Sequence, residues 1–358
     1  MPAASCTGLL EIPHRSTRSA SGELRNRERN LKIAAYIGGV LGLALLIVLF
    51  VRSDFIGMLQ VLGLAGWRLL WLIPYRILFF LLYAIGWFNL IRPYDPNRHA
   101  GLGYMLWVTS VREAIDRLLP VASVGGGIAG VRLLRWRGLT ATPASATVIV
   151  EILLTLIASY LFAVVGLLLL VDAKAGGSEY RHLILALLVS LPVPVGTALL
   201  LRYGSVFERL EGVLRPFVVA GAVSAGATAL DHEVRACLRR GRALLIAGGL
   251  QFAALVSGSV EIWFVLRLFG HPVSVRAALV MESMTQAMRH LAFVIPGGLG
   301  VQEGTLVLFG HVLGVNSELA LAVSMAKRMR EVLCGLPSLA SWQWVEGWRL
   351  RRPNRNPS

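Results

Sequence analysis

The sequence predicts an all-α membrane protein with about eight transmembrane helices, arranged in two halves that each contain a Pro- and Gly-rich break. Of the 358 residues, 56% are apolar and 15% are charged, whereas soluble domains carry about 25% charged residues. Residues 33–51 and 183–201 contain no Asp, Glu, Lys or Arg, and each run is about as long as a helix that crosses a bilayer. Two segments, Pro120–Gly130 and Pro296–Gly304, interrupt the apolar pattern. The function is therefore expected in or between the membrane helices.

The remaining candidate spans are less uniformly apolar. Four of them contain a single charged residue each, and three are more polar. The single-charge runs are 55–73 with Arg68, 74–91 with Arg76, 142–171 with Glu151 and 243–266 with Glu261, and the more polar runs are 101–119, 277–295 and 317–345.

The positions of the basic residues predict the domain organisation. The net charge of +15 is concentrated before the first span, in one long internal connection and at the C-terminus, and basic connections mark the cytoplasmic side of a membrane. This distribution argues against a nucleic-acid partner. We expect a basic cytosolic tail at 1–30, membrane halves at 31–201 and 243–348, a cytosolic connection at 202–242 and a basic tail at 349–358.

Two connections carry further predictions about topology. Val206, Leu210, Val213 and Phe217 recur at helical spacing, which predicts an amphipathic helix on the membrane surface that tethers the two halves. The connection 172–181 has balanced charge and is expected outside the cytosol. The basic C-terminus favours the cytosol, but a re-entrant segment at 296–316 would place it outside, so its side stays open.

The two breaks predict an internal repeat. Non-helical backbone at membrane depth is tolerated only inside protein or beside a water-filled cavity, and breaks at matching places in two halves point to a transporter's substrate site. One common shift along the chain superposes four identical pairs: Pro120 on Pro296, Gly138 on Gly314, Ala144 on Ala320 and Ala146 on Ala322.

Ionisable residues inside the spans are the candidates for substrate binding, because each is expensive to bury in a membrane. Glu151 and Lys327 lie at the same separation from the proline of their half, and we expect them to meet. Arg68, Arg76 and Glu261 are expected instead to snorkel or to form static salt bridges. The candidate substrate-binding residues are Arg112, Glu113, Arg117, Pro120, Gly125, Gly126, Arg132, Glu151, Glu282, Arg289, His290, Pro296, Gly297, Gly298, Gly300, Glu303, Lys327, Arg328 and Glu331.

No sequence motif indicates catalysis, a metal or a cofactor. Cys6, Cys237 and Cys334 are scattered and lack metal-ligand or redox spacing. The seven histidines are dispersed, and Gly125-Gly126-Gly127 lacks the spacing of a dinucleotide-binding loop. We therefore expect no cofactor and no enzymatic activity.

Two segments resemble the signatures of the lysylphosphatidylglycerol synthase transmembrane, or flippase-like, family. The first runs from Leu118 to Gly126 and continues with Val131–Leu134 and Arg137–Leu139, and the second is Ile295–Gly304 followed by Leu313–Val315 and Ala320–Arg328. The residues of the first segment are similar to those of the family branch found with bacterial hopanoid-biosynthesis genes. Gly127 stands where that branch tends to have an acid, so no carboxylate role is implied there. The soluble aminoacyl-transfer domain of the full synthases is not present in this sequence.

The resemblance implies an integral protein of the bacterial inner membrane that binds or translocates a lipid, either a hopanoid or an anionic phospholipid. Two other classes remain open. An integral-membrane enzyme that modifies a hopanoid or isoprenoid would turn over its substrate as a purified protein. A non-transporting scaffold for lipid-biosynthesis enzymes would tolerate neutralisation of the charged interior residues.

Overall fold

The described part of the chain is helical throughout. The computed structural model describes residues 66–119, 125–173, 192–206, 224–291 and 300–351, and within these ranges it contains no strand. The all-α prediction is therefore confirmed for the described residues. The elements are η1 (Gly66–Trp71), α3 (Leu72–Ile91), η2 (Arg92–Tyr94), α4 (Leu102–Leu118), α5 (Gly125–Arg135), α6 (Ala141–Ala173), α8 (Pro192–Tyr203), α10 (Ser224–Leu238), α11 (Gly241–Leu268), α12 (Val275–Leu291), α13 (Val301–Val312) and α14 (Ser317–Arg351).

Three helical segments in the described ranges are long and apolar enough to cross a membrane: Gly66–Tyr94, Ala141–Asp172 and Gly241–Leu268. The last two agree with the predicted spans 142–171 and 243–266. The first joins the described end of the predicted span 55–73 to the predicted span 74–91, because η1 runs directly into α3. Residues 55–65 lie outside the described residues. Pro74 lies in the first turn of α3, where a proline does not interrupt the helix. The span 33–51 and the first part of 183–201 lie outside the described residues.

Helices α4 and α5 form an antiparallel hairpin. The Tyr104 hydroxyl near the start of α4 donates a hydrogen bond to the Leu133 carbonyl near the end of α5, at 2.7 Å. At the other end, the backbone N–H of Gly126 donates to Oδ1 of Asp116 at 2.9 Å. With 17 residues in α4 and 11 in α5, neither helix reaches the roughly 20 residues that cross a bilayer.

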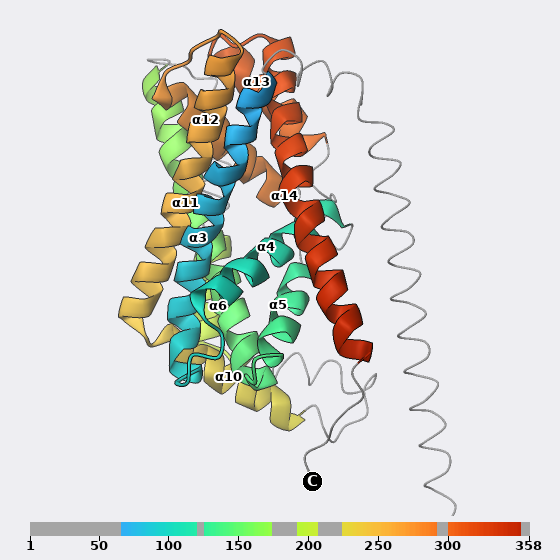
Figure 1. The fold of residues 1–358 in the computed structure, drawn as a ribbon. Coiled ribbons are helices and arrows are strands. Elements are labelled where there is room, and N and C mark those ends of the chain that lie inside the picture. The colour runs from blue at the N-terminus through green and yellow to red at the C-terminus, as the bar shows by residue number, and fades with distance from the viewer. Residues whose placement is uncertain (1–65, 120–124, 174–191, 207–223, 292–299, 352–358) are drawn as a thin grey trace, which may run out of the picture. The chain divides into compact units, whose positions relative to one another are not determined.

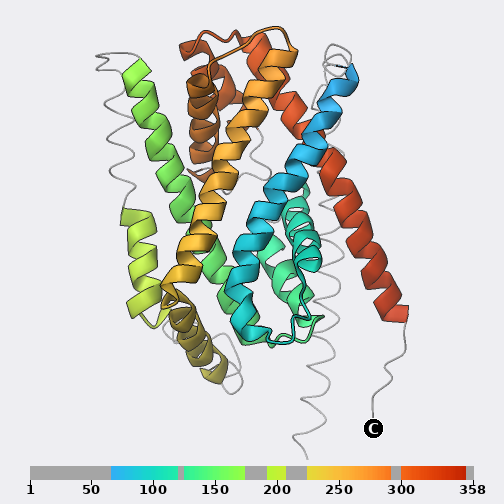
Figure 2. The ribbon, with the colours of Figure 1, turned by 60° about the vertical axis from the view of Figure 1, so that its left-hand side comes forward.

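Helices α12 and α13 form a second hairpin of the same kind. The Arg289 guanidinium near the end of α12 donates to the Gln302 side chain near the start of α13 at 2.8 Å, and Met281 of α12 lies beside Gly310 of α13. The α12–α13 hairpin lies in the upper half of Figure 1 and the α4–α5 hairpin in the lower half, and Figure 2 agrees. The two hairpins therefore enter from opposite ends.

The contacts of α14 resolve the position of the C-terminal end. Near the end of α14, Glu346 pairs with Arg132 of α5, and the Arg349 guanidinium lies 4.6 Å from the Trp136 ring centroid. The end of α10 lies at the same end of the bundle, where Arg240 stacks on Tyr94. The conflict between a re-entrant segment and a cytosolic C-terminus therefore does not arise in the described bundle, because α12 has 17 residues and is shorter than the roughly 20 that cross a bilayer.

The described helices bury charges and expose apolar side chains. Helix α3 buries Arg76 and exposes Leu78, and α6 buries Glu151 and exposes Leu168. In water this arrangement would be unfavourable, whereas a hydrocarbon surround favours the exposed apolar side chains. Only part of the predicted tether is described. Helix α10 packs on α6 with Cys237 fully buried, whereas residues 207–223, which contain most of the predicted amphipathic helix, lie outside the described residues.

Candidate functional site

A cavity of about 340 Å³ lies between the two hairpins and the long helices α3, α6, α11 and α14. Its volume is in the lower part of the roughly 300–1,000 Å³ range of small-molecule sites. Six basic side chains line it: Arg76, Arg112, Arg117, Arg289, Lys327 and Arg330. Six acidic side chains line it as well: Glu113, Asp116, Glu151, Glu261, Glu282 and Glu331.

Two ion-pair groups belong to the N-terminal helices. Arg112 of α4 binds Glu151 of α6 at 2.6 Å, and its guanidinium lies 4.3 Å from the ring centroid of Trp87. Glu113 of α4 bridges two cations, with Arg76 of α3 at 2.6 Å and Arg117 at 2.9 Å. Helix periodicity explains this grouping, because Glu113 and Arg117 are one turn apart on α4 and face the same way.

Two more pairs join the C-terminal helices. Lys327 of α14 pairs with Glu282 of α12, and Arg330 pairs with Glu261 of α11 at 2.9 Å. All four side chains are at most 3% exposed. Removing one partner of such a pair leaves an uncompensated buried charge, which is far more costly than removing an exposed pair.

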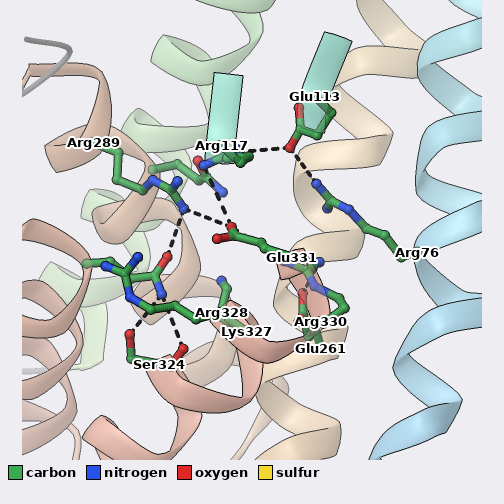
Figure 3. Close-up of polar contacts among 12 residues, drawn as sticks. Arg76, Glu113, Arg117, Glu261, Arg289, Ser324, Lys327, Arg328, Arg330 and Glu331 are labelled. Atoms are coloured by element: carbon green, nitrogen blue, oxygen red, sulfur yellow. Dashed lines mark hydrogen bonds and ion pairs between the residues drawn. The ribbon is translucent and has the colours of Figure 1, made fainter. Parts of the chain in front are cut away.

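Glu331 lies where the two halves meet. Three guanidinium groups surround its Oε1: Arg289 at 3.5 Å, Arg330 at 3.7 Å and Arg117 at 4.0 Å. Figure 3 shows Arg117 from α4 and Arg289 from α12 both directed at this carboxylate. The ends of the two re-entrant helices are thus connected through one acidic side chain of α14.

The predicted meeting of Glu151 and Lys327 is wrong. Both side chains line the cavity, but Glu151 pairs with Arg112 and Lys327 pairs with Glu282. Each half therefore neutralises its own lone charge with a partner from the neighbouring re-entrant helix.

Of the three charges that were expected to snorkel or to form static salt bridges, two form salt bridges and one is exposed. Arg76 and Glu261 form buried salt bridges with Glu113 and Arg330. Arg68 is exposed in η1, beside the start of α3. A buried salt bridge therefore explains two of the three charges.

The structure brings nearly half of the candidate site residues together. The nine that line the cavity are Arg112, Glu113, Arg117, Glu151, Glu282, Arg289, His290, Lys327 and Glu331. They come from α4, α6, α12 and α14, so the tertiary arrangement unites positions from both halves of the chain.

The other candidates lie elsewhere or outside the described residues. Gly125 and Gly126 begin α5, and Arg132 pairs with Glu346 at the end of the bundle. Gly300 precedes α13 with a φ of +76°, a conformation that favours glycine, and its N–H donates to Glu303. Glu303 also binds Arg328 at 2.5 Å, away from the cavity lining. Pro120, Pro296, Gly297 and Gly298 fall outside the described residues.

Four charged lining residues were missing from the predicted site: Arg76, Asp116, Glu261 and Arg330. The sequence carried a signal for two of them, Arg76 and Glu261, since a lone charge in an apolar run needs a partner. Arg330 lies among other charged residues between Lys327 and Glu331. Asp116 gave a weaker signal because it lies in a charged stretch at the end of α4.

The fold and the site define a helical membrane protein that holds a highly charged cavity inside an apolar exterior. Residues 36–336 match the family described as the lysylphosphatidylglycerol synthase TM region. The chain therefore belongs to this family, and it is an integral membrane protein with a lipid-related function. No curated protein and no solved structure matched the chain.

Proposed function

We propose that this protein binds the headgroup of a membrane lipid in the charged cavity and translocates the lipid across or within the bacterial inner membrane. The observation that carries the proposal is the cavity itself, with twelve charged side chains surrounded by helices that expose apolar residues. Polar groups at membrane depth face substrate pathways or one another. A headgroup could therefore exchange partners with these side chains while its acyl tails stay in the bilayer.

The two hairpins support a transport mechanism based on an inverted repeat. Helices α5 and α6 begin at Gly125 and Ala141, and the same shift along the chain places their starts on those of α13 and α14, at Val301 and Ser317. Two glycines with positive φ, +89° and +83°, follow the hairpins at positions 138 and 314. In addition, α4 packs on α14 as α12 packs on α6. Transporters with such repeats place the substrate between the halves.

We further propose that the protein moves the lipid without modifying it, and that the membrane lipid is its principal partner. The family resemblance leaves two substrate classes, a hopanoid and an anionic phospholipid, and membership of the hopanoid-associated branch is part of this proposal. Association with lipid-biosynthesis enzymes would supply the substrate on one side of the membrane.

Native mass spectrometry and a translocation assay test the proposal together. The gently purified protein should carry a co-purifying lipid of unchanged mass. After reconstitution in liposomes, it should expose acyl-labelled lipid of the inner leaflet to an external quencher. Arg289→Gln should slow this exposure, because Arg289 lines the cavity between the hairpins.

Asp172→Asn is the matched control, since Asp172 and Arg276 form an exposed pair away from the cavity, with side chains 68% and 67% exposed. It should translocate lipid at the native rate. Lipid exposure no faster than in protein-free liposomes, with no co-purifying lipid, would exclude the proposed function. Chemical conversion of the bound lipid by the purified protein would instead indicate an enzyme.

A further inference from the structure

The cavity is electrically balanced in both halves. On the N-terminal side, Arg76, Arg112 and Arg117 face Glu113, Asp116 and Glu151, and on the C-terminal side Arg289, Lys327 and Arg330 face Glu261, Glu282 and Glu331. An added net charge would have no counter-charge in this low-dielectric surround. A ligand of zero net charge that carries both signs would keep the balance.

Four close pairs account for eight of these twelve groups. They are Arg76 with Glu113, Arg112 with Glu151, Lys327 with Glu282 and Arg330 with Glu261. The four remaining groups are Arg117, Arg289, Glu331 and Asp116. Arg117 and Arg289 both face Glu331, which leaves a local excess of one positive charge. Asp116 leaves an excess of one negative charge elsewhere in the cavity.

The positive region is able to hold a phosphate. Arg289 and Arg117 lie 3.5 and 4.0 Å from Oε1 of Glu331, beyond the roughly 2.7–3.2 Å of an N–H···O hydrogen bond. Arg117 uses its Nε for Glu113, and Arg289 uses Nη1 for Gln302. Each guanidinium therefore keeps N–H donors for a ligand, and its planar geometry matches two phosphate oxygens.

The negative region is able to hold an ammonium group. Among the described residues, Asp116 is the one cavity carboxylate without a Lys, Arg or His nitrogen within 4.0 Å. Its Oδ1 accepts the N–H of Gly126, which fixes the carboxylate between α4 and α5. Its Oδ2 accepts no hydrogen bond from the described residues. An ammonium donor would complete this site.

We propose that the cavity selects a phospholipid whose headgroup has no net charge and carries one phosphodiester and one primary amine. Arg117 and Arg289 bind the phosphodiester, and Asp116 binds the ammonium. This inference rests on the proposed translocation of a membrane lipid, and it assigns a zwitterionic phospholipid in place of the two substrate classes that the family resemblance leaves. A headgroup without net charge has a second advantage. The free energy of moving a net charge across the membrane depends on the membrane potential, whereas the free energy of moving a neutral headgroup does not.

Titration of the native protein with two defined lipids tests this selectivity. The detergent-solubilised full chain is titrated with dihexanoyl phosphatidylethanolamine and with dihexanoyl phosphatidylglycerol, and binding is followed by native mass spectrometry. We expect the ethanolamine lipid to bind about tenfold more tightly, a ratio that corresponds to about 1.4 kcal/mol. Soluble glycerophosphoethanolamine should compete poorly, which separates a lipid from a free metabolite.

Two variants separate the two subsites. Asp116→Asn should weaken binding of the ethanolamine lipid about tenfold and leave binding of the glycerol lipid unchanged. The asparagine carbonyl oxygen still accepts the hydrogen bond from the Gly126 N–H, but the side chain no longer carries the negative charge that attracts the ammonium group. Arg289→Gln should weaken both lipids, since both carry the phosphodiester. Asp172→Asn should change neither.

Equal or tighter binding of the glycerol lipid to the native protein would overturn the inference and leave the proposed function intact. Equal weakening of both lipids by Asp116→Asn would also overturn it, as would full competition by glycerophosphoethanolamine. Binding of neither lipid, together with the absence of translocation, would contradict the proposed function itself.

Discussion

Glu282 and Lys327 show how a buried charge is held in this protein. Their side chains are each 3% exposed, and Gln286 donates a further hydrogen bond to Glu282 at 2.7 Å. We expect Glu282→Gln and Lys327→Gln each to lower the free energy of unfolding by about 3–5 kcal/mol, because either change leaves one charge buried without its partner. Thermal unfolding of the detergent-solubilised variants measures this loss. Asp172→Asn, which breaks an exposed pair, should change stability by about 1 kcal/mol or less.

A double-mutant cycle distinguishes the observed pairing from the one that the sequence predicted. Glu282→Gln combined with Lys327→Gln should destabilise by clearly less than the sum of the single changes, because both charges are then removed. Glu151→Gln combined with Lys327→Gln should be close to additive, since Glu151 pairs with Arg112 instead. Strong coupling between Glu151 and Lys327, without coupling between Glu282 and Lys327, would contradict the structure.

At the residue scale, the sequence identified the charged residues that need an oppositely charged partner, but it did not identify those partners. Glu151 and Lys327 stood out because each interrupts or adjoins an apolar run. Their assignment to one another relied on chain symmetry alone, whereas distance in space decides an ion pair. Asp116 was overlooked because its role depends on the position of α5 rather than on its neighbours in the chain.

The close approach of α4 and α5 is the feature of the hairpins that a single substitution tests best. A Cβ at Gly126 would collide with Oδ2 of Asp116 and would lie 2.7 Å from the Arg112 carbonyl oxygen. Gly126→Ala should therefore lower the free energy of unfolding by about 1–3 kcal/mol, the usual cost of overpacking. It should also weaken lipid binding, because both displaced residues line the cavity.

Gly103→Ala provides the matched control within the same hairpin. Nothing lies within 4 Å of a Cβ at Gly103, and alanine favours a helix over glycine by up to about 1 kcal/mol. This variant should be as stable as the native protein or slightly more stable. Equal destabilisation by both substitutions in the same unfolding assay would show that α4 and α5 do not pack as described.

At the element scale, the sequence located the breaks but not the nature of the helices that flank them, which it predicted as complete spans. The Pro- and Gly-rich segments do fall where α4 is followed by α5 and α12 by α13, but the predicted breaks were too long. Gly125–Gly130 and Val301–Gly304 are helical and belong to α5 and α13. However, helix α12 has 17 residues, and its apolar and charged residues alone do not distinguish a short re-entrant helix from a polar span. The direction in which the chain returns is set by packing against α13, which the sequence does not encode locally.

The topology of the described bundle leads to a labelling prediction. The variants Asn97→Cys, Gly347→Cys and Ser317→Cys are made singly in a background without the three native cysteines. Positions 97 and 347 lie at the end that carries Arg132, Arg240 and Arg349, and position 317 lies at the opposite end. Because basic residues mark the cytosolic side, a membrane-impermeant thiol reagent should label position 317 in intact cells, and label the other two only after permeabilisation.

The exposed tryptophans agree with this placement. Trp67 and Trp71 lie near the start of α3, and Trp344 and Trp348 lie near the end of α14, where all four are more than half exposed. Tryptophan is enriched at both membrane interfaces. Labelling of positions 97 and 317 from the same side of the membrane would contradict the arrangement of the two hairpins.

The sequence by itself determined that this is a helical membrane protein, because apolar runs and their charged interruptions are local properties of the chain. The lipid-related family followed from the similarity of its segments to that family. The sequence also located the two breaks and most of the charges that matter. Only the tertiary structure decided that the hairpins enter from opposite ends, and that Arg117, Arg289 and Glu331 meet while Asp116 stays free of a described cationic partner. These are distances between helices far apart in the chain, and they depend on how whole helices pack against one another.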